Sequence, residues 1–125
     1  VSDTYVETLG LEVVAGRDFD PAYPSDRDGW LINESTARQL NWSAEEAVGK
    51  RLARLSDEGP DSNRWGTVLG VVRDAHFRSL HWDVQPMVLG HRLDLSGVRY
   101  AAVRVNPADM AASLANLERL YASWE

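Results

Sequence analysis

The apolar run WGTVLGVV at residues 65–72 constrains the fold more than any other stretch of the sequence. It is far shorter than the ~20 apolar residues that a membrane-spanning helix requires. A short continuous apolar run of this kind is typical of a buried strand. We therefore predict that residues 65–72 form the central strand of a sheet, and that the remaining elements are arranged around it.

Shorter patterns place the other elements along the chain. Residues 11–16, 30–33, 50–55, 87–91 and 98–105 are short apolar or alternating runs and predict strands. Residues 2–10, 34–40 and 43–49, and the segment from Asn106 to Trp124, predict helices. All four helices begin at residues that commonly cap a helix N-terminus, which are Ser2, Asn33, Ser43 and Asn106.

The order of these elements indicates the fold class. Single strands mixed with short helices favour an α+β domain with a mixed β-sheet. The last helix carries apolar residues at helical spacing, which are Met110, Leu114, Leu117, Tyr121 and Trp124. Such a stripe predicts an amphipathic C-terminal helix packed on the sheet. Because no linker or repeat interrupts the pattern, we expect residues 1–125 to form a single domain.

Composition excludes several classes of function. The 125 residues contain no cysteine, which excludes metal sites built on thiolates and cysteine nucleophiles. The net charge of −6 argues against a general nucleic-acid binder, because such proteins need a basic surface to neutralise phosphates. The hydrophobic fraction of 44% is ordinary for a globular protein that folds without metals or disulfides.

One stretch after the central strand raises the question of a metal site. Asp74, His76 and His81 lie close together in sequence, and His91 is the last residue of the next predicted strand. The two histidines in this stretch, five residues apart, point to opposite faces of a strand and do not share one helix face. A metal- or ligand-binding domain that uses Asp74, His76 and His81 is therefore the alternative hypothesis, and a strand exit with structural side chains is preferred.

Catalytic motifs are not found in the sequence. The acidic segment RDFDPAYPSDRD at residues 17–28 lies in a predicted polar loop, where aspartates are expected to be solvated. There is no GxSxG elbow, no phosphate loop and no GxGxxG motif. The sequence therefore gives no residue that we assign as a catalytic residue, metal ligand or cofactor-binding residue.

A set of motifs resembles one family in order and spacing. Residues 1–19 are similar to the segment VSxxYxxTLGxxxxxGRxF of ABC transporter permeases with a MacB-like periplasmic core domain and an FtsX-like membrane part. LINESTARQLNW resembles the family's xxINExxAxxL helix, and AVGKRL resembles its xIGKxL turn. Residues 66–89 resemble its xxVVGVVxDxxxxSLxxxxxPxxx segment, and residues 100–124 resemble its closing strand and helix.

The resemblance implies a location and a role. It implies an extracytoplasmic domain on the periplasmic face of the bacterial inner membrane, and a chain that is an excised fragment of a longer permease. Its partners would be the membrane helices of the parent permease, a separate ATPase subunit, and a periplasmic partner or cargo. The implied function is the non-catalytic relay of conformational change during ATP-driven export. A free-standing periplasmic binding or adaptor module is the second alternative.

Overall fold

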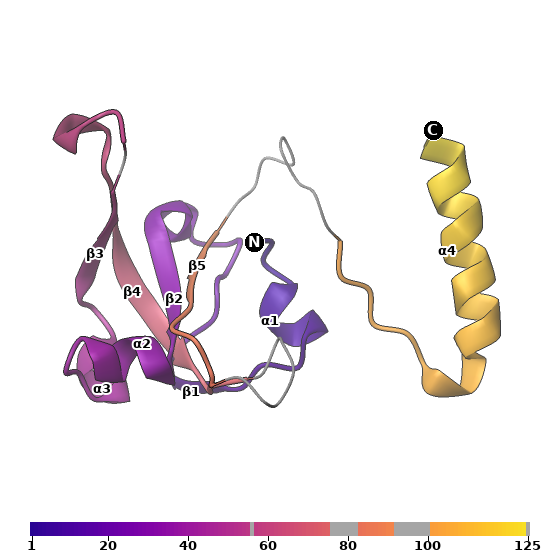
Figure 1. The fold of residues 1–125 in the computed structure, drawn as a ribbon, viewed down its shortest axis with the longest axis horizontal. Coiled ribbons are helices and arrows are strands. Elements are labelled where there is room, and N and C mark those ends of the chain that lie inside the picture. Colours follow the sequence, from indigo (N-terminus) through magenta and orange to yellow (C-terminus); the bar gives the residue numbers. More distant parts are fainter. Residues whose placement is uncertain (56, 76–82, 92–100, 125) are drawn as a thin grey trace.

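The strand predicted from the longest apolar run lies at the centre of the sheet. In a computed structural model, which describes residues 1–55, 57–75, 83–91 and 101–124, strand β4 covers Arg64–Val72. Three other strands pair directly with β4, and the order through the five-stranded sheet is β1-β4-β2-β5, with β3 also paired to β4. The prediction of a central strand is confirmed (Figure 1).

The sheet is mixed, as predicted. Strands β2 and β4 run parallel, whereas the pairs β1–β4, β3–β4 and β2–β5 are antiparallel. The bounds of the four shorter strands are Val13–Gly16 for β1, Gly29–Asn33 for β2, Arg51–Arg54 for β3 and Val88–Gly90 for β5. Together with the helices, this topology confirms the α+β fold class.

Short helices connect the strands. The α-helices are α1 (Tyr5–Thr8), α2 (Glu34–Gln39), α3 (Ala44–Ala47) and α4 (Met110–Trp124). The 3-10 helices are η1 (Pro24–Asp28), η2 (Pro60–Ser62) and η3 (Pro107–Asp109). Within the described residues, none of the helices is both long enough and apolar enough to cross a bilayer.

Three of the four predicted caps are confirmed, including Asn106, whose side chain accepts a hydrogen bond from the backbone nitrogen of Ala108. The side chain of Asn33 accepts a hydrogen bond from the backbone nitrogen of Thr36, and that of Ser43 accepts one from Glu46. These bonds satisfy backbone donors that the first turn of a helix leaves without partners. The prediction for Ser2 is wrong, because α1 begins after Thr4 rather than after Ser2 and has no side-chain capping bond.

The core lies on both faces of the sheet. One cluster of buried residues packs α1 against the sheet and contains Val6, Phe19, Leu31, Val72 and Leu89. The other packs α2 and α3 against the opposite face and contains Ile32, Ala37, Ala47, Val68 and Val71. Successive residues of β2 and β4 enter different clusters because side chains alternate between the faces of a strand. This alternation explains why the central strands are apolar without interruption.

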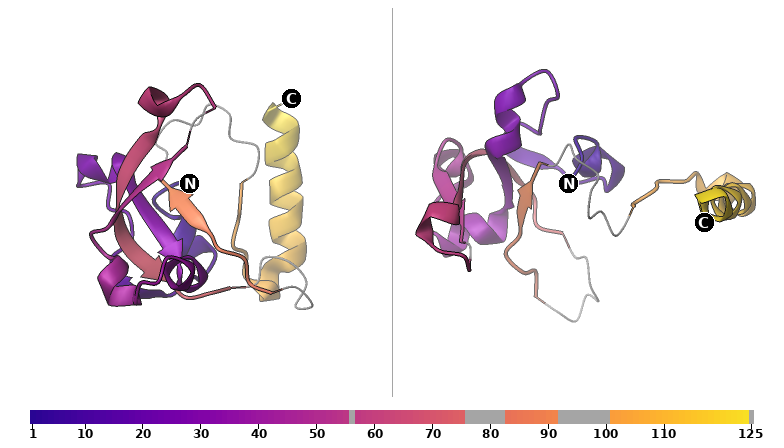
Figure 2. Two further views of the ribbon diagram at one scale, coloured as in Figure 1. Left: turned by 60° about the vertical axis from the view of Figure 1, so that its left-hand side comes forward. Right: turned by 90° about the horizontal axis from the view of Figure 1, so that it is seen from above.

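The C-terminal segment differs from the prediction. Helix α4 forms, but none of its residues is buried, and Leu114, Tyr121 and Trp124 are exposed by 50%, 67% and 80%. Figures 1 and 2 show α4 standing apart from the sheet. The predicted packing of this helix on the sheet is therefore not observed. An amphipathic pattern fixes the helix and its apolar face, but it does not identify the surface that receives that face.

The predicted strand at residues 98–105 is also not observed. Residues 101–105 belong to no strand, and residues 98–100 lie outside the described part of the chain. Alternation of polar and apolar residues shows which side chains would share a face, but a strand needs a hydrogen-bonded neighbour.

Candidate functional site

Asp74 connects the end of the central strand to the beginning of α2. Its Oδ1 accepts a hydrogen bond from the backbone nitrogen of Ser35 at 2.8 Å, and its Oδ2 accepts one from the hydroxyl of Ser35 at 2.9 Å. Arg38 donates to the same Oδ2 at 2.7 Å. The backbone nitrogen of Asp74 donates in return to the carboxylate of Glu34 at 2.9 Å. Both carboxylate oxygens of Asp74 are therefore engaged within the fold.

These contacts determine the ionisation of Asp74. Partial burial opposes the charged form, but hydrogen bonds from Arg38 and from Ser35 outweigh it, so the pKa of Asp74 lies below its ordinary value. A carboxylate held ionised by an arginine and a helix N-terminus stabilises the junction of β4 and α2. This arrangement favours the structural interpretation of Asp74 that we preferred from the sequence.

The residues of the alternative metal site are not assembled in the described part of the chain. His76 and His81 lie outside the described residues, so their contribution stays a prediction. His91 follows β5, whose Gly90 pairs with Trp30, whereas Val72 at the end of β4 pairs with Asn33. These pairings are separated along β2 by roughly 10 Å, so His91 and Asp74 lie toward opposite ends of that strand.

No cluster of three or more histidine, aspartate or glutamate side chains suited to a metal ion is found among residues 1–55, 57–75, 83–91 and 101–124. A site that included His76 or His81 is not tested by this finding.

The acidic segment before β2 contains an ion pair whose carboxylate, that of Asp26, is buried, which corrects the prediction of a solvated aspartate at this position. Asp26 is only 1% exposed. The guanidinium of Arg17 donates to both of its carboxylate oxygens, at 2.6 and 2.7 Å. The backbone nitrogen of Asp20 donates to Asp26 as well, at 2.8 Å. Paired, short and bidentate hydrogen bonds of this kind compensate the desolvation of a carboxylate.

The contacts with Arg17 stabilise the ionised form of Asp26. The hydrogen bonds from Arg17 lower the pKa of Asp26 and outweigh the opposing effect of burial. The same contact raises the pKa of Arg17. The arginine also lies over the ring of Tyr23, 4.9 Å from its centroid. The pair fastens the loop between β1 and β2, and nothing in its geometry requires a ligand.

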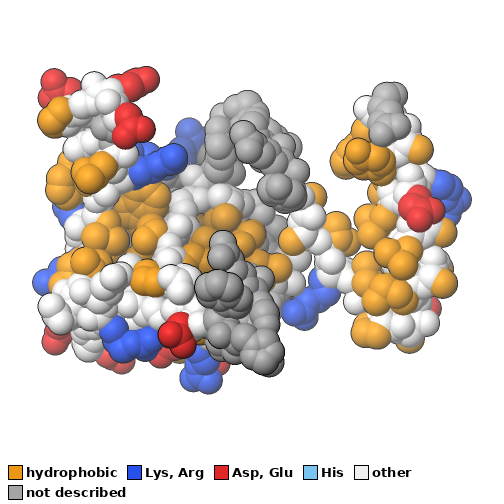
Figure 3. Space-filling view, viewed as in Figure 1, with side chains coloured by type: hydrophobic (Ala, Val, Ile, Leu, Met, Phe, Trp, Pro, Cys, Tyr) orange, Lys and Arg blue, Asp and Glu red, His pale blue; other side chains and the backbone are white. Residues whose placement is uncertain are grey.

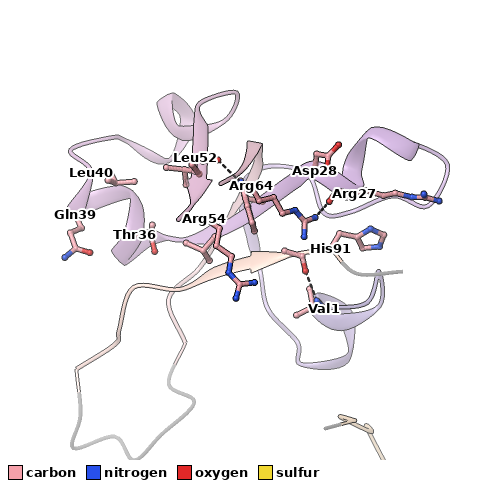
Figure 4. Close-up of a pocket in the computed structure, with 14 residues that line it drawn as sticks. Val1, Arg27, Asp28, Thr36, Gln39, Leu40, Leu52, Arg54, Arg64 and His91 are labelled. Carbon is pink, nitrogen blue, oxygen red and sulfur yellow. Dashed lines mark hydrogen bonds between the residues drawn. The ribbon is translucent and has the colours of Figure 1, made fainter. Parts of the chain in front are cut away.

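A cleft of about 950 Å³ lies over the sheet between α2, the β3–β4 hairpin and β5. Figure 4 shows the labelled residues that surround it. Thr36 and Leu40 border it on the α2 side, Arg54 and Arg64 on the hairpin side, and His91 on the β5 side. Its volume falls within the range of about 300–1,000 Å³ typical of ligand pockets. This cleft is the candidate functional site.

His91 is the most unusual side chain in the cleft wall. It is 4% exposed, and its ring stacks on that of Phe19 with centroids 4.9 Å apart. Neither ring nitrogen has a hydrogen-bond partner within the described part of the chain. Buried polar atoms are seldom left in this state, because an unmade hydrogen bond costs about 1–3 kcal/mol.

Sequence reasoning did not identify this cleft. Its charged wall comes from a hairpin whose two strands were not recognised as partners, although RLARL and RW lie on either side of a turn rich in Gly, Pro and Asp. That spacing could have predicted the hairpin. The position of His91 could not have been found in this way, because its neighbour Phe19 is distant in sequence.

The fold can be compared with known proteins. No protein-family model and no curated protein sequence matches the chain. One solved structure that matches is "a domain of a putative permease protein" from Porphyromonas gingivalis, with a TM-score of 0.53 and 23% sequence identity. The match covers 94% of this chain and 56% of the other chain.

The two proteins share a fold. The alignment extends over nearly the whole of this chain, which spans little more than half of the length of the other. Because no family model matches, the resemblance to MacB-like and FtsX-like permeases that the sequence motifs indicate stays a prediction.

Proposed function

We propose that this chain is a non-catalytic extracytoplasmic domain of an ABC transporter permease of the MacB/FtsX-like kind. The observation that carries the proposal is the fold shared with a protein described as a permease domain, aligned over 94% of this chain. The ordered motifs of the sequence, from VSDTYVETLG to the closing helix, point in the same direction. Fold alone does not determine function, so the assignment needs a direct test.

The proposed role is mechanical. The domain would be connected to the membrane helices of the parent permease, and a separate ATPase subunit would drive the movement of those helices. The sheet with its short helices would move as one unit, because α2 is fixed to Asp74 after β4 and, through Asn33, to Met87 just before β5. Such a body would transmit movement to a periplasmic partner or cargo during export.

The chemistry of the described side chains supports a non-catalytic role. Asp26 and Asp74, the two carboxylates whose pKa is lowered in the described part of the chain, are held by Arg17 and Arg38 in contacts that stabilise the fold. Structural ion pairs shift pKa values as catalytic sites do, but here both oxygens of each carboxylate are occupied. A free-standing periplasmic binding module remains the alternative function.

Cysteine labelling in intact cells tests the location. The chain has no cysteine, so each single substitution provides one thiol in this domain. In the parent protein, with cysteines elsewhere replaced, Leu55→Cys at a side chain that is 79% exposed should react with a membrane-impermeant maleimide without cell lysis. The matched control Ala47→Cys, at a residue that is 0% exposed, should react only after denaturation. Labelling of Leu55→Cys only after lysis would contradict the extracytoplasmic location.

Distance measurements in the reconstituted transporter test the mechanical role. Spin labels at Tyr23→Cys and Leu55→Cys, both at exposed positions, should keep one separation through the ATPase cycle. A third label in a membrane helix should change its distance to either of them when ATP is added. A parent protein without membrane helices would instead favour the free-standing module. Altered distances within the domain itself would contradict the rigid relay.

A further inference from the structure

The cleft between α2, the β3–β4 hairpin and β5 combines an apolar surface with positive charge. Leu40, Leu52 and Val88 line it, and Leu40 and Val88 are 39% and 47% exposed. Trp30 also borders it, with its Nε1 donating to the carbonyl of Leu52 at 3.1 Å. Figure 3 shows apolar side chains over this part of the body as well as on α4. Apolar surface beside a charged wall suits an amphipathic ligand.

The charged wall is a pair of arginines that face each other. Arg54 on β3 and Arg64 on β4 are direct partners in the register of the antiparallel pair. Like charges in directly opposite positions destabilise a sheet. In Figure 4 the side chain of Arg54 extends from the hairpin toward β5, and that of Arg64 extends toward Arg27. A bound anion would turn this unfavourable juxtaposition into a favourable one, because guanidinium groups bind carboxylates in a bidentate manner.

Neither arginine is neutralised by a carboxylate within the described residues. The ion pairs found there use Arg17, Arg38 and Arg73 instead. Arg64 donates to the carbonyl of Arg27 and lies over the ring of Trp30, 5.4 Å from its centroid. The cleft is lined by Arg27, Arg54 and Arg64 and by one carboxylate, that of Asp28, so its wall has an excess of positive charge in a chain whose net charge is −6. A positively charged cleft in a negatively charged chain favours an acidic ligand.

His91 provides an independent indication of a ligand. It lines the same cleft, it is 4% exposed, and both of its ring nitrogens lack a partner in the described part of the chain. Both nitrogens are shielded from solvent, and the ring stacks on Phe19. A polar group of the ligand would supply the missing hydrogen bond once the ring turns toward the cleft.

The edge of the sheet favours a peptide as the ligand. Among the described strands, β5 pairs only with β2, and its residues Val88 and Gly90 line the cleft. The carbonyl of Gly90 already accepts a hydrogen bond from the N-terminal nitrogen of Val1 at 2.6 Å, so a peptide added at this edge would use the remaining backbone groups of β5 or displace Val1. An extended peptide adds to such an edge by backbone hydrogen bonding, whereas a lipid chain cannot.

We propose that the cleft binds an acidic, extended peptide segment of a partner protein. A carboxylate of the peptide lies between Arg54 and Arg64, its backbone runs along β5, and an apolar side chain rests on the surface formed by Leu40, Leu52 and Val88. The proposal goes beyond the permease assignment. It is tested on the isolated chain, so its outcome is separate from that of the labelling experiment in cells.

Fluorescence anisotropy with a labelled nine-residue peptide of alternating Glu and Val tests the proposal. We expect saturable binding to the 125-residue chain at low salt, which weakens as salt is added. The double variant Arg54→Gln/Arg64→Gln should bind at least tenfold more weakly. The control Arg51→Gln/Arg119→Gln removes the same charge at exposed positions outside the cleft and should bind as the unmodified chain does.

The matched peptide of alternating Gln and Val separates charge recognition from non-specific adsorption. Equal binding of the two peptides, or equal loss of binding in the two double variants, would overturn the proposal. Vesicles containing phosphatidylglycerol provide the other comparison. Arginine-dependent binding to these vesicles without binding to the acidic peptide would assign the cleft to a lipid surface and overturn the peptide proposal. Melting curves of all variants verify that each is folded.

Discussion

Asn33 and Met87 are joined by two hydrogen bonds at the end of β2. The backbone nitrogen of Asn33 donates to the carbonyl of Met87 at 3.1 Å, and Oδ1 of Asn33 accepts from the backbone nitrogen of Met87 at 3.0 Å. The same Oδ1 accepts from the backbone nitrogen of Thr36, and Nδ2 donates to the carbonyl of Gln85. One buried amide therefore fixes both the first turn of α2 and the segment that leads into β5.

Replacing Asn33 should test this junction. Asn33→Ala leaves several buried backbone groups without partners, so we expect it to lower the free energy of unfolding by about 2–3 kcal/mol. Ser43→Ala removes a single capping bond at the less buried start of α3 and should cost about 0.5–1 kcal/mol. Urea denaturation measures both values. Equal losses in the two variants would mean that Asn33 acts only as a helix cap.

The ion pair between Arg17 and Asp26 is expected to stabilise the loop before β2. Asp26→Asn removes the charge that Arg17 contacts and keeps the size of the side chain, so we expect a loss of about 2 kcal/mol in the free energy of unfolding. Because Arg17 is 44% exposed, solvent will compensate part of its lost contact. Asp28→Asn, at an exposed neighbour, should change stability by less than about 0.5 kcal/mol. If Asp26→Asn leaves the free energy of unfolding unchanged, the ion pair does not stabilise this loop.

Stability should fall in acid because of Asp26 and Asp74. Both have a pKa below 3.8 in the folded chain, so the unfolded chain binds more protons in this range. Their contribution is complete above pH ~4, near the unfolded pKa, and is lost as pH falls through the folded pKa values. The variant Asp26→Asn/Asp74→Asn should therefore show a shallower decrease in melting temperature between pH ~5 and ~2.

Asp18 is expected to affect the pH dependence of stability in the opposite direction, because its pKa is raised. Burial raises the pKa of Asp18, with a smaller opposing effect of its hydrogen bond from the backbone nitrogen of Phe19. Its protonated form is thus favoured in the folded chain, so its contribution is present at low pH and lost as pH rises through the folded pKa. Asp18→Asn keeps an acceptor for Phe19 and should raise the melting temperature at pH 7. A decrease at pH 7 would contradict this interpretation.

The separation of α4 from the sheet is testable by truncating one side chain. Leu114 is 50% exposed, so Leu114→Ala should change the free energy of unfolding by less than about 0.5 kcal/mol. Leu31 is 0% exposed at the centre of the sheet, and Leu31→Ala should cost about 2–5 kcal/mol. If Leu114→Ala costs more than about 2 kcal/mol, the helix packs against an apolar surface in solution, as its sequence pattern predicts.

Local signals were sufficient for most of the regular elements. The run at residues 65–72 predicted β4, and Asn33 and Ser43 predicted the start of α2 and α3, because a cap and a buried strand depend on side chains within a few residues. The same reasoning failed at residues 101–105 and for the packing of α4. Both of those predictions depended on contacts with a surface that the sequence pattern does not identify.

The sequence by itself determined the α+β class, the central strand and the helix caps of this protein, because these follow from periodicity and nearest neighbours. Only the tertiary structure decided which polar residues meet. Asp26 pairs with Arg17 rather than with solvent, Asp74 with Ser35 and Arg38 rather than with a metal ligand set, and Arg54 faces Arg64 beside the cleft of His91. Strand order and register bring these groups together, and that order is fixed by the packing of both sheet faces.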